Sequence, residues 1–162
     1  MLKANFITAQ EAAEKIQDGS TLCTIGMTLV SASESILKAI EKRFETVGHP
    51  ADITLVHSCG QSDRKDGIQH LAHEGLVKRI VGSHWGLQPR WMEMIANSQV
   101  EAYCLPQGQI AQLYRSMACG LPGKMSKVGL GTFIDPRVEG GKMNDRTKPV
   151  SYTHLTLPTT ER

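Results

Sequence analysis

The chain has 162 residues, a formal net charge of +2 and 40% hydrophobic residues. A chain of about 150 residues buries roughly two thirds of its unfolded surface, so one core can stabilise it without disulfides or a structural metal. The Lys and Arg residues are dispersed among acids, which argues against a nucleic-acid partner. No apolar run approaches the roughly 18 residues of a membrane span, and no signal peptide begins the chain, so we expect a cytoplasmic protein with no membrane partner.

The first elements carry clear local signals. Thr8 and Glu11 have the spacing of a capping box, in which each side chain bonds the other's backbone amide, and they predict a helix over residues 8–17. Residues 21–25 are β-prone and end at a glycine, which indicates a buried strand. Apolar residues recur at helical spacing over residues 33–45 and predict an amphipathic helix.

Strands and helices go on alternating along the chain. Further strands are predicted at residues 52–57, 79–82, 100–104 and 128–131, and helical stretches at 68–74, 88–96 and 109–119. This alternation is typical of an α/β fold, with an open, mainly parallel sheet and helices on both faces. Ligands of such sheets bind at the carboxyl ends of the strands. The loops expected there are residues 26–32, 58–67, 83–89, 105–108 and 131–141.

The last 14 residues differ in composition from the rest, with four Thr, two Pro and no Gly. They resemble the conceptual translation of a transposase adapter used in DNA library preparation. We therefore predict one natural domain over residues 1–148, belonging to a truncated enzyme, and a non-native, disordered tail over residues 149–162. A genuine Thr-rich terminal tail is the alternative.

The four cysteines stand far apart, with neither a C-x-x-C pair nor a zinc-type Cys-His spacing. They are predicted to be free and mostly buried thiols. His70 and His73 could share a helix face, but the H-E-x-x-H order is reversed and spacing supplies no third ligand. A hydrogen-bonded structural pair is the favoured interpretation, and no metal site is predicted.

Three short motifs sit where strands should end. The segment that starts at Gly26 follows a strand and enters a helix, so its backbone could meet an oxyanion or phosphate, or it could be a plain turn capped by Ser31 or Ser33. It lacks the G-x-G-x-x-G and P-loop spacings, which excludes those nucleotide fingerprints. Residues 83–86, Ser-His-Trp-Gly, suit a site wall and core packing equally. Residues 106–108, Pro-Gln-Gly, aim an amide that could orient a carboxylate.

Three separated motifs occur in order, at residues 73–86, 105–108 and 128–144. Together they resemble the N-terminal half of the acyl-CoA:carboxylate CoA-transferases of the acetate or propionate type. The resemblance implies an α/β fold shared with some sugar-phosphate isomerases. It also implies acyl-CoA and a small carboxylate as substrates, a C-terminal half as partner, a homo-oligomer when complete, and no cofactor besides coenzyme A as substrate.

The family's reaction is ping-pong. A glutamate carboxylate attacks the acyl-CoA carbonyl to give an acyl-glutamyl anhydride. The released CoA thiolate converts this to a glutamyl-CoA thioester, from which the acceptor carboxylate takes CoA. In this family that glutamate lies in the C-terminal half, and no match to its motif occurs in this chain. We therefore predict no catalytic residue here and no activity of the fragment alone.

The resemblance assigns substrate contacts residue by residue. Gln107 matches the amide that contacts the catalytic glutamate or the acyl group, and the Gly26 loop matches the turn that helps to form the oxyanion site. The predicted substrate-binding residues are Gly26, Met27, Thr28, His84, Gln107 and Gly108. Two alternatives stay open: a non-catalytic domain that binds acyl-CoA or a sugar phosphate, and an isomerase that pairs His84 with Asp63 or Asp66.

Overall fold

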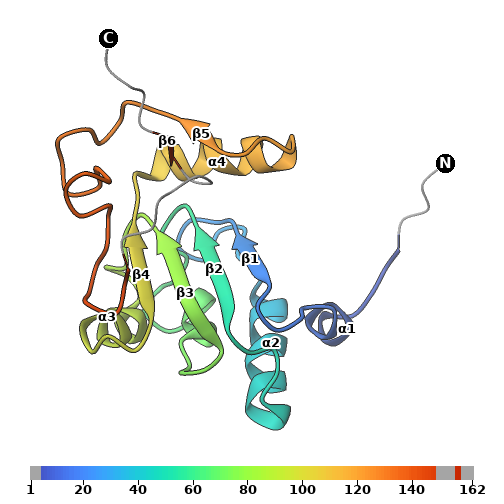
Figure 1. Cartoon of the computed structure of the whole chain (residues 1–162). Coiled ribbons are helices and arrows are strands. Elements are labelled where there is room, and N and C mark those ends of the chain that lie inside the picture. The colour runs from blue at the N-terminus through green and yellow to red at the C-terminus, as the bar shows by residue number, and fades with distance from the viewer. Residues whose placement is uncertain (1–4, 149–155, 158–162) are drawn as a thin grey trace.

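The computed structural model describes residues 5–148 and 156–157. Its centre is a four-stranded parallel sheet in the order β1-β2-β3-β4 (Figure 1). The strands are β1 Thr21–Thr24, β2 Ile53–His57, β3 Val77–Gly82 and β4 Glu101–Cys104. The helices are α1 Ala9–Glu14, α2 Glu34–Val47, the 3-10 helix η1 Gly67–Leu71, α3 Pro89–Ala96 and α4 Gln107–Ala118. The predicted α/β fold with a parallel sheet is confirmed.

The capping box predicted at the first helix is present. The Thr8 amide donates to Glu11 Oε2 at 2.7 Å, and the Glu11 amide donates to Thr8 Oγ1 at 3.2 Å. The Arg43 guanidinium of α2 donates to the carbonyl of Ala13 at 2.7 Å and to that of Ile16 at 2.9 Å. These bonds give the Ile16 carbonyl a partner and the Ala13 carbonyl a second kind of partner besides the Ile16 amide, and they hold α1 against α2.

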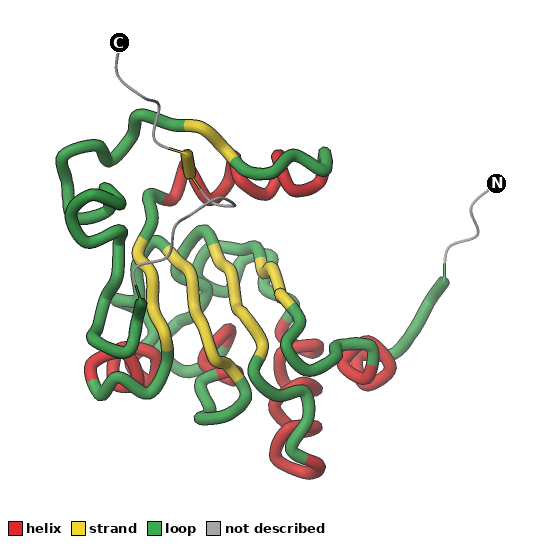
Figure 2. The backbone as a smooth tube through the Cα atoms, viewed as in Figure 1, coloured by secondary structure: helices red, strands yellow, loops and turns green. Residues whose placement is uncertain are grey.

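Helices α2, η1 and α3 lie on one face of the sheet, whereas α4 lies at the carboxyl ends of the strands (Figures 1 and 2). On this face α2, η1 and α3 enclose the larger core, which contains Leu55 of β2, Ile80 of β3 and the fully buried Trp91 of α3. Helix α4 lies across the carboxyl ends of the strands. Its Ile110 packs against strand residues there, and the Tyr114 hydroxyl donates to the carbonyl of Val56 at 3.2 Å.

The interpretation of residues 21–25 as a buried strand is wrong. Thr21 and Cys23 are exposed, and Leu22 and Thr24 are half-buried. The reason is topological: among the described strands β1 pairs only with β2, so it forms an edge of the sheet. A β-prone composition predicts a strand, whereas its burial depends on what lies beside it.

A strand at residues 128–131 is also wrong, because Gly129 has φ +90° and Gly131 has φ +74°, within a series of turns. The segment that adds to the sheet is residues 141–143, which runs antiparallel beside β4. The Cys104 amide donates to the Gly141 carbonyl at 2.7 Å, and the Met143 amide donates to the Ala102 carbonyl at 2.9 Å.

The four cysteines are free, as predicted, but the expectation that they are mostly buried is wrong. Only Cys59 is buried, while Cys23 and Cys119 are exposed. Within the described residues no helix is both long and apolar enough to cross a membrane.

The predicted tail, residues 149–162, lies outside the described residues apart from Thr156–Leu157. This pair forms β6, which is parallel to β5 at Lys124–Met125.

Candidate functional site

A cavity of about 320 Å³ opens at the carboxyl ends of β3 and β4. Three of the five predicted ligand loops meet there, residues 83–89, 105–108 and 131–141. The first two follow the neighbouring strands β3 and β4, and the third belongs to a segment that returns to β4. Its lining residues are Ser83, His84, Cys104, Leu105, Pro106, Gln107, Phe133 and Ile134. The structure thus brings two of the predicted site residues, His84 and Gln107, to one cavity.

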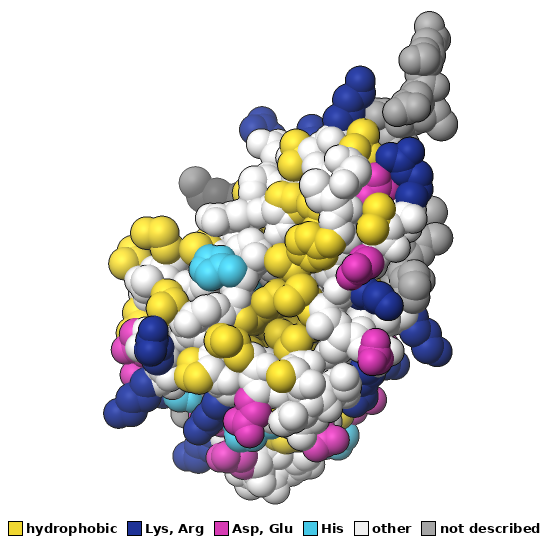
Figure 3. All heavy atoms as spheres, turned by 90° about the vertical axis from the view of Figure 1, so that its left-hand side faces the viewer, with side chains coloured by type: hydrophobic (Ala, Val, Ile, Leu, Met, Phe, Trp, Pro, Cys, Tyr) yellow, Lys and Arg dark blue, Asp and Glu magenta, His cyan; other side chains and the backbone are white. Residues whose placement is uncertain are grey.

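The cavity combines an apolar wall with a few polar groups, which is the usual make-up of a small-molecule site. Leu105, Phe133 and Ile134 supply apolar lining, and Gln107 and His84 are exposed polar residues. On the side of the molecule that carries β4 and residues 126–146, hydrophobic side chains gather in a band (Figure 3). Phe133 is 45% exposed and so remains accessible.

Gln107 is the first residue of α4, directly after Pro106. Proline fixes the backbone that enters the helix, so the amide leaves from a defined point at the cavity. Gly108 follows within the first turn of α4 and, unlike Gln107, does not line the cavity. An amide is neutral and can both donate and accept hydrogen bonds, which suits contact with a carboxyl group.

The Gly26 loop forms a tight turn in which some of the backbone amides already donate hydrogen bonds within the protein. The Met27 amide donates to the Val30 carbonyl at 3.1 Å, and the Thr28 amide donates to the Gly60 carbonyl at 2.8 Å. Gly26 has φ +141°, and a Cβ there would lie 2.9 Å from the Val30 carbonyl oxygen, so the turn requires glycine. The amides of Met27 and Thr28 therefore hold the loop together rather than face outward.

Gly60 joins this loop to His84. A Cβ at Gly60 would lie 2.7 Å from His84 Nε2, so the imidazole packs directly over the glycine. His84 Nδ1 lies 3.0 Å from the Ser83 hydroxyl, which donates to the carbonyl of Ser58 at 2.8 Å. Loops that follow β1, β2 and β3 are thus connected, and the predicted residues on them form one continuous edge with the cavity.

Within residues 83–86, the site-wall interpretation holds for His84 and the core-packing interpretation holds for Trp85. His84 is exposed and lines the cavity, as a site wall would. Trp85 is buried and meets His57 edge-on, with ring centroids 5.9 Å apart, as a packing residue would.

The isomerase alternative needs an acid near His84, and the structure does not bring one there from Asp63 or Asp66. The Asp63 carboxylate accepts from the amides of Lys65 and Asp66 at 3.0 and 2.9 Å, within its own turn. Asp66 lies 3.4 Å from His70 instead. The pairing on which that alternative depended is therefore absent from the described part of the chain.

The apolar wall is positioned by residues that a search for chemical motifs missed. Asp135 is 2% exposed and accepts from the Gly131 amide at 2.8 Å and from the Arg137 guanidinium. These bonds hold the pKa of Asp135 well below its usual range, and the bond from Arg137 has the largest effect. Because Asp135 fixes the turn next to Phe133 and Ile134, the Ile-Asp-Pro-Arg motif of residues 134–137 was the available signal for this wall.

The coenzyme A transferase family model matches residues 6–160 of the chain. The chain belongs to the coenzyme A transferase family. It is 42% identical to the caffeate CoA-transferase of Acetobacterium woodii over 145 residues, and 38% identical to the acetate CoA-transferase YdiF of Escherichia coli K12 over 144 residues. These alignments cover 89% and 88% of this chain but only 28% and 27% of the relatives.

Crystal structures of acyl-CoA transferase YdiF from E. coli O157:H7 resemble this CoA-transferase chain in fold, with a TM-score of 0.81 at 37% identity. One is the apoenzyme and another is a thioester complex with CoA. The likeness covers 88% of this chain and 28% of YdiF. The chain therefore spans little more than a quarter of the relatives that it matches.

Proposed function

We propose that this chain is the N-terminal, substrate-binding part of a CoA-transferase that moves CoA between a short-chain acyl-CoA and a free carboxylate such as acetate or propionate. The observation that carries the proposal is the cavity at the carboxyl ends of β3 and β4, where exposed Gln107 and His84 adjoin an apolar wall. In a member of this family, such a cavity suits a small acyl group beside a carboxyl group. Coenzyme A would be the substrate.

Each part of the cavity has a chemical role in this proposal. The amide of Gln107 would bond a carboxylate or an acyl oxygen, and Phe133 and Ile134 would exclude water from the acyl chain. The amides of Gly26, Leu29 and Ser31 donate no hydrogen bond within the part of the chain that the structure describes, so these would be the donors of the Gly26 loop available to a ligand. They, rather than Met27 and Thr28, would stabilise an oxyanion.

The nucleophilic glutamate would come from the remainder of the enzyme, so the chain alone should not transfer CoA. The assay incubates the 162-residue chain with acetyl-CoA and propionate and follows propionyl-CoA. We expect no propionyl-CoA above the background without protein. Transfer at the rate of a complete CoA-transferase would contradict the proposal that the nucleophile lies elsewhere.

Binding distinguishes the proposed substrate from the alternative of a sugar-phosphate domain. Calorimetry of the chain should detect acetyl-CoA and not ribose 5-phosphate. Gln107→Ala should weaken acetyl-CoA binding by about tenfold, the cost of one hydrogen bond to a charged or polar group. Gln112→Ala, an exposed glutamine on the same helix, is the matched control and should bind as the parent does. Preference for ribose 5-phosphate would favour the alternative.

A further inference from the structure

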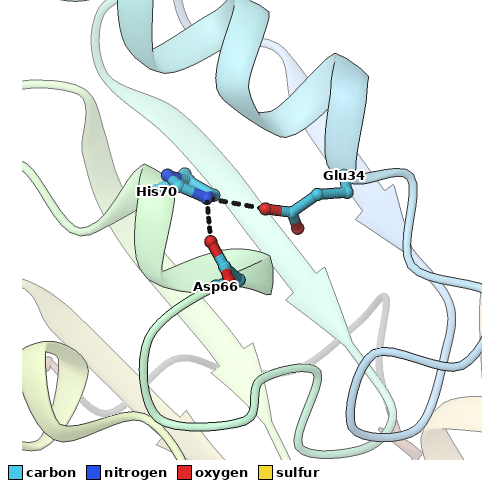
Figure 4. Close-up of side chains that lie close together, drawn as sticks. All are labelled: Glu34, Asp66 and His70. Atoms are coloured by element: carbon cyan, nitrogen blue, oxygen red, sulfur yellow. Dashed lines mark hydrogen bonds and ion pairs between the residues drawn. The ribbon is translucent and has the colours of Figure 1, made fainter.

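A second cluster of side chains lies apart from the cavity, between α2 and η1 (Figure 4). Glu34 is the first residue of α2, Asp66 precedes η1 as its cap, and His70 lies within η1. His70 Nε2 is 2.8 Å from Glu34 Oε1 and 3.4 Å from Asp66 Oδ1. The side chains of His70, Glu34 and Asp66 are 13%, 29% and 31% exposed, so the three groups converge in a partly desolvated position.

The other nitrogen of His70 is already held by a carboxylate. His70 Nδ1 hydrogen-bonds Glu41 Oε2, and the second oxygen of Glu41 lies 2.9 Å from His73 Nε2. A carboxylate on one imidazole nitrogen fixes the ring and directs the other nitrogen, which is the arrangement around metal-bound histidines. Glu41 thus points Nε2 of His70 at Glu34 and Asp66.

The same point already attracts a positive charge. Lys38 Nζ lies 3.1 Å from Glu34 Oε1 and 3.5 Å from Asp66 Oδ1, the two oxygens that face His70. The Lys38 side chain is 53% exposed, and its flexible stem can turn to solvent. A cation that approaches from solvent can therefore replace the ammonium without moving the backbone.

The distances suit a small tetrahedral ion. Ligand atoms about 2.0–2.1 Å from zinc are about 3.3 Å apart along each tetrahedral edge. His70 Nε2 lies 3.4 Å from Asp66 Oδ1, which already matches this edge length. It lies 2.8 Å from Glu34 Oε1, so these two atoms would have to move apart by a fraction of an ångström. An imidazole with two carboxylates is a ligand set that zinc accepts.

We propose that Glu34, Asp66 and His70 form a binding site for a divalent zinc-type ion, with Glu41 as the positioning residue for His70. On binding, His70 Nε2 gives its proton to solvent and its lone pair to the metal, and Lys38 leaves the two carboxylates. The sequence predicted no metal site here, because Glu34 and Glu41 lie on a helix that spacing does not connect to His70, and Asp66, four residues before His70, gives only one further ligand.

The ion would act as a clamp behind the candidate substrate site. Glu34 begins the helix that follows the Gly26 loop, and its second oxygen accepts from the Gly67 amide at 2.9 Å. Asp66 ends the loop that starts after β2 and contains Gly60, whose carbonyl accepts from the Thr28 amide. A metal that joins Glu34 to Asp66 would therefore hold both loops. This site is independent of the proposed transferase function.

The test uses the 162-residue chain after removal of metals with a chelator. Zinc chloride is titrated calorimetrically, and cobalt(II) is added separately as a spectroscopic probe of tetrahedral coordination. We expect one ion per chain, a raised melting temperature and a visible cobalt absorption band. His70→Gln and Asp66→Asn should each weaken zinc binding by at least about tenfold, and Glu41→Gln by about tenfold or more through lost orientation of His70.

Two variants sharpen the result. Lys38→Met removes the competing ammonium and should strengthen zinc binding, an effect that a merely structural role of the cluster does not explain. His49→Gln is the matched control, because His49 pairs with Asp18 at 2.9 Å in a separate, exposed pair. If His70→Gln does not fold, as circular dichroism would reveal, Asp66→Asn and Lys38→Met still decide. Absence of saturable binding at micromolar zinc, or binding unaffected by Asp66→Asn and Lys38→Met, would overturn the proposal.

Discussion

At the scale of single residues, His57 links stability to pH. It is fully buried, and its Nδ1 donates to the Cys59 carbonyl at 2.7 Å. Burial lowers the pKa of His57 to about 4, from about 6.5 in an unfolded chain. At pH values between about 4 and 6.5, His57 is therefore protonated in the unfolded state and neutral in the folded state. Stability that is complete above pH 6.5 is lost as the pH falls toward 4, by about 3 kcal/mol in all.

Urea unfolding at a series of pH values checks this prediction. The free energy of unfolding should fall between pH 6.5 and 4, and His57→Leu should remove much of that slope while lowering stability at pH 7. His49→Gln, which changes an exposed histidine, should leave most of the slope in place. An NMR titration of the native protein in which His57 protonates near its ordinary pKa would contradict the burial argument.

At the scale of elements, the sequence predicted the helices that depend on interactions between residues close together in the chain. The Thr8–Glu11 box predicted the start of α1, and apolar periodicity predicted α2, because both depend on residues within a few positions of each other. The burial of β1 and the pairing of residues 141–143 with β4 depend on distant segments. The strand prediction at 128–131 followed apolar content, but the left-handed glycines in that segment impose turns.

The candidate site was predictable to the same extent. Parallel strands carry the following loops to one edge, so His84 and Gln107 could be expected near each other before the structure was known. Phe133 and Ile134 reach the cavity only because the chain returns to β4 through a long series of turns, which no spacing rule encodes. For the same reason, the sequence could not show which amides of the Gly26 loop lack a hydrogen-bond acceptor. One of them, the Thr28 amide, donates to the carbonyl of Gly60 in a different loop.

The segment beside β4 depends on Gly141. Its φ is +74°, and a Cβ there would lie 2.5 Å from the Cys104 carbonyl oxygen, which is backbone and cannot turn aside. Gly141→Ala should lower the free energy of unfolding by about 1–3 kcal/mol, because strain and overpacking act together. The Gly141 amide also donates to the Phe133 carbonyl at 3.0 Å, so the variant should loosen the apolar wall as well.

Urea unfolding and amide hydrogen exchange measure the two effects of Gly141→Ala. Exchange at the Cys104 and Met143 amides should accelerate, since these pair the segment with β4. Gly86→Ala is the matched control: Gly86 is exposed, and its added Cβ would meet nothing within 4 Å. Equal stability of the two variants would contradict the role given to Gly141.

At the scale of the whole molecule, the chain exposes apolar side chains on the loop that follows β1. Ile25, Met27 and Val30 are 65%, 61% and 66% exposed on a loop at the carboxyl end of the edge strand β1. Single exposed apolar residues are ordinary, but several on one short loop mark an interaction surface. This surface adjoins the candidate site, because Thr28 of the same loop bonds Gly60.

We therefore expect the isolated chain to self-associate as its concentration rises, which sedimentation velocity or light scattering would detect. The double variant Ile25→Ser with Val30→Ser should shift the chain toward monomer, because it removes apolar area without touching the core. Val47→Ser is the control, since Val47 is 58% exposed but ends α2, away from this loop. A parent chain that stays monomeric at high concentration would show that this surface needs no cover, and equal effects of both variants would show that the loop is not the site of contact.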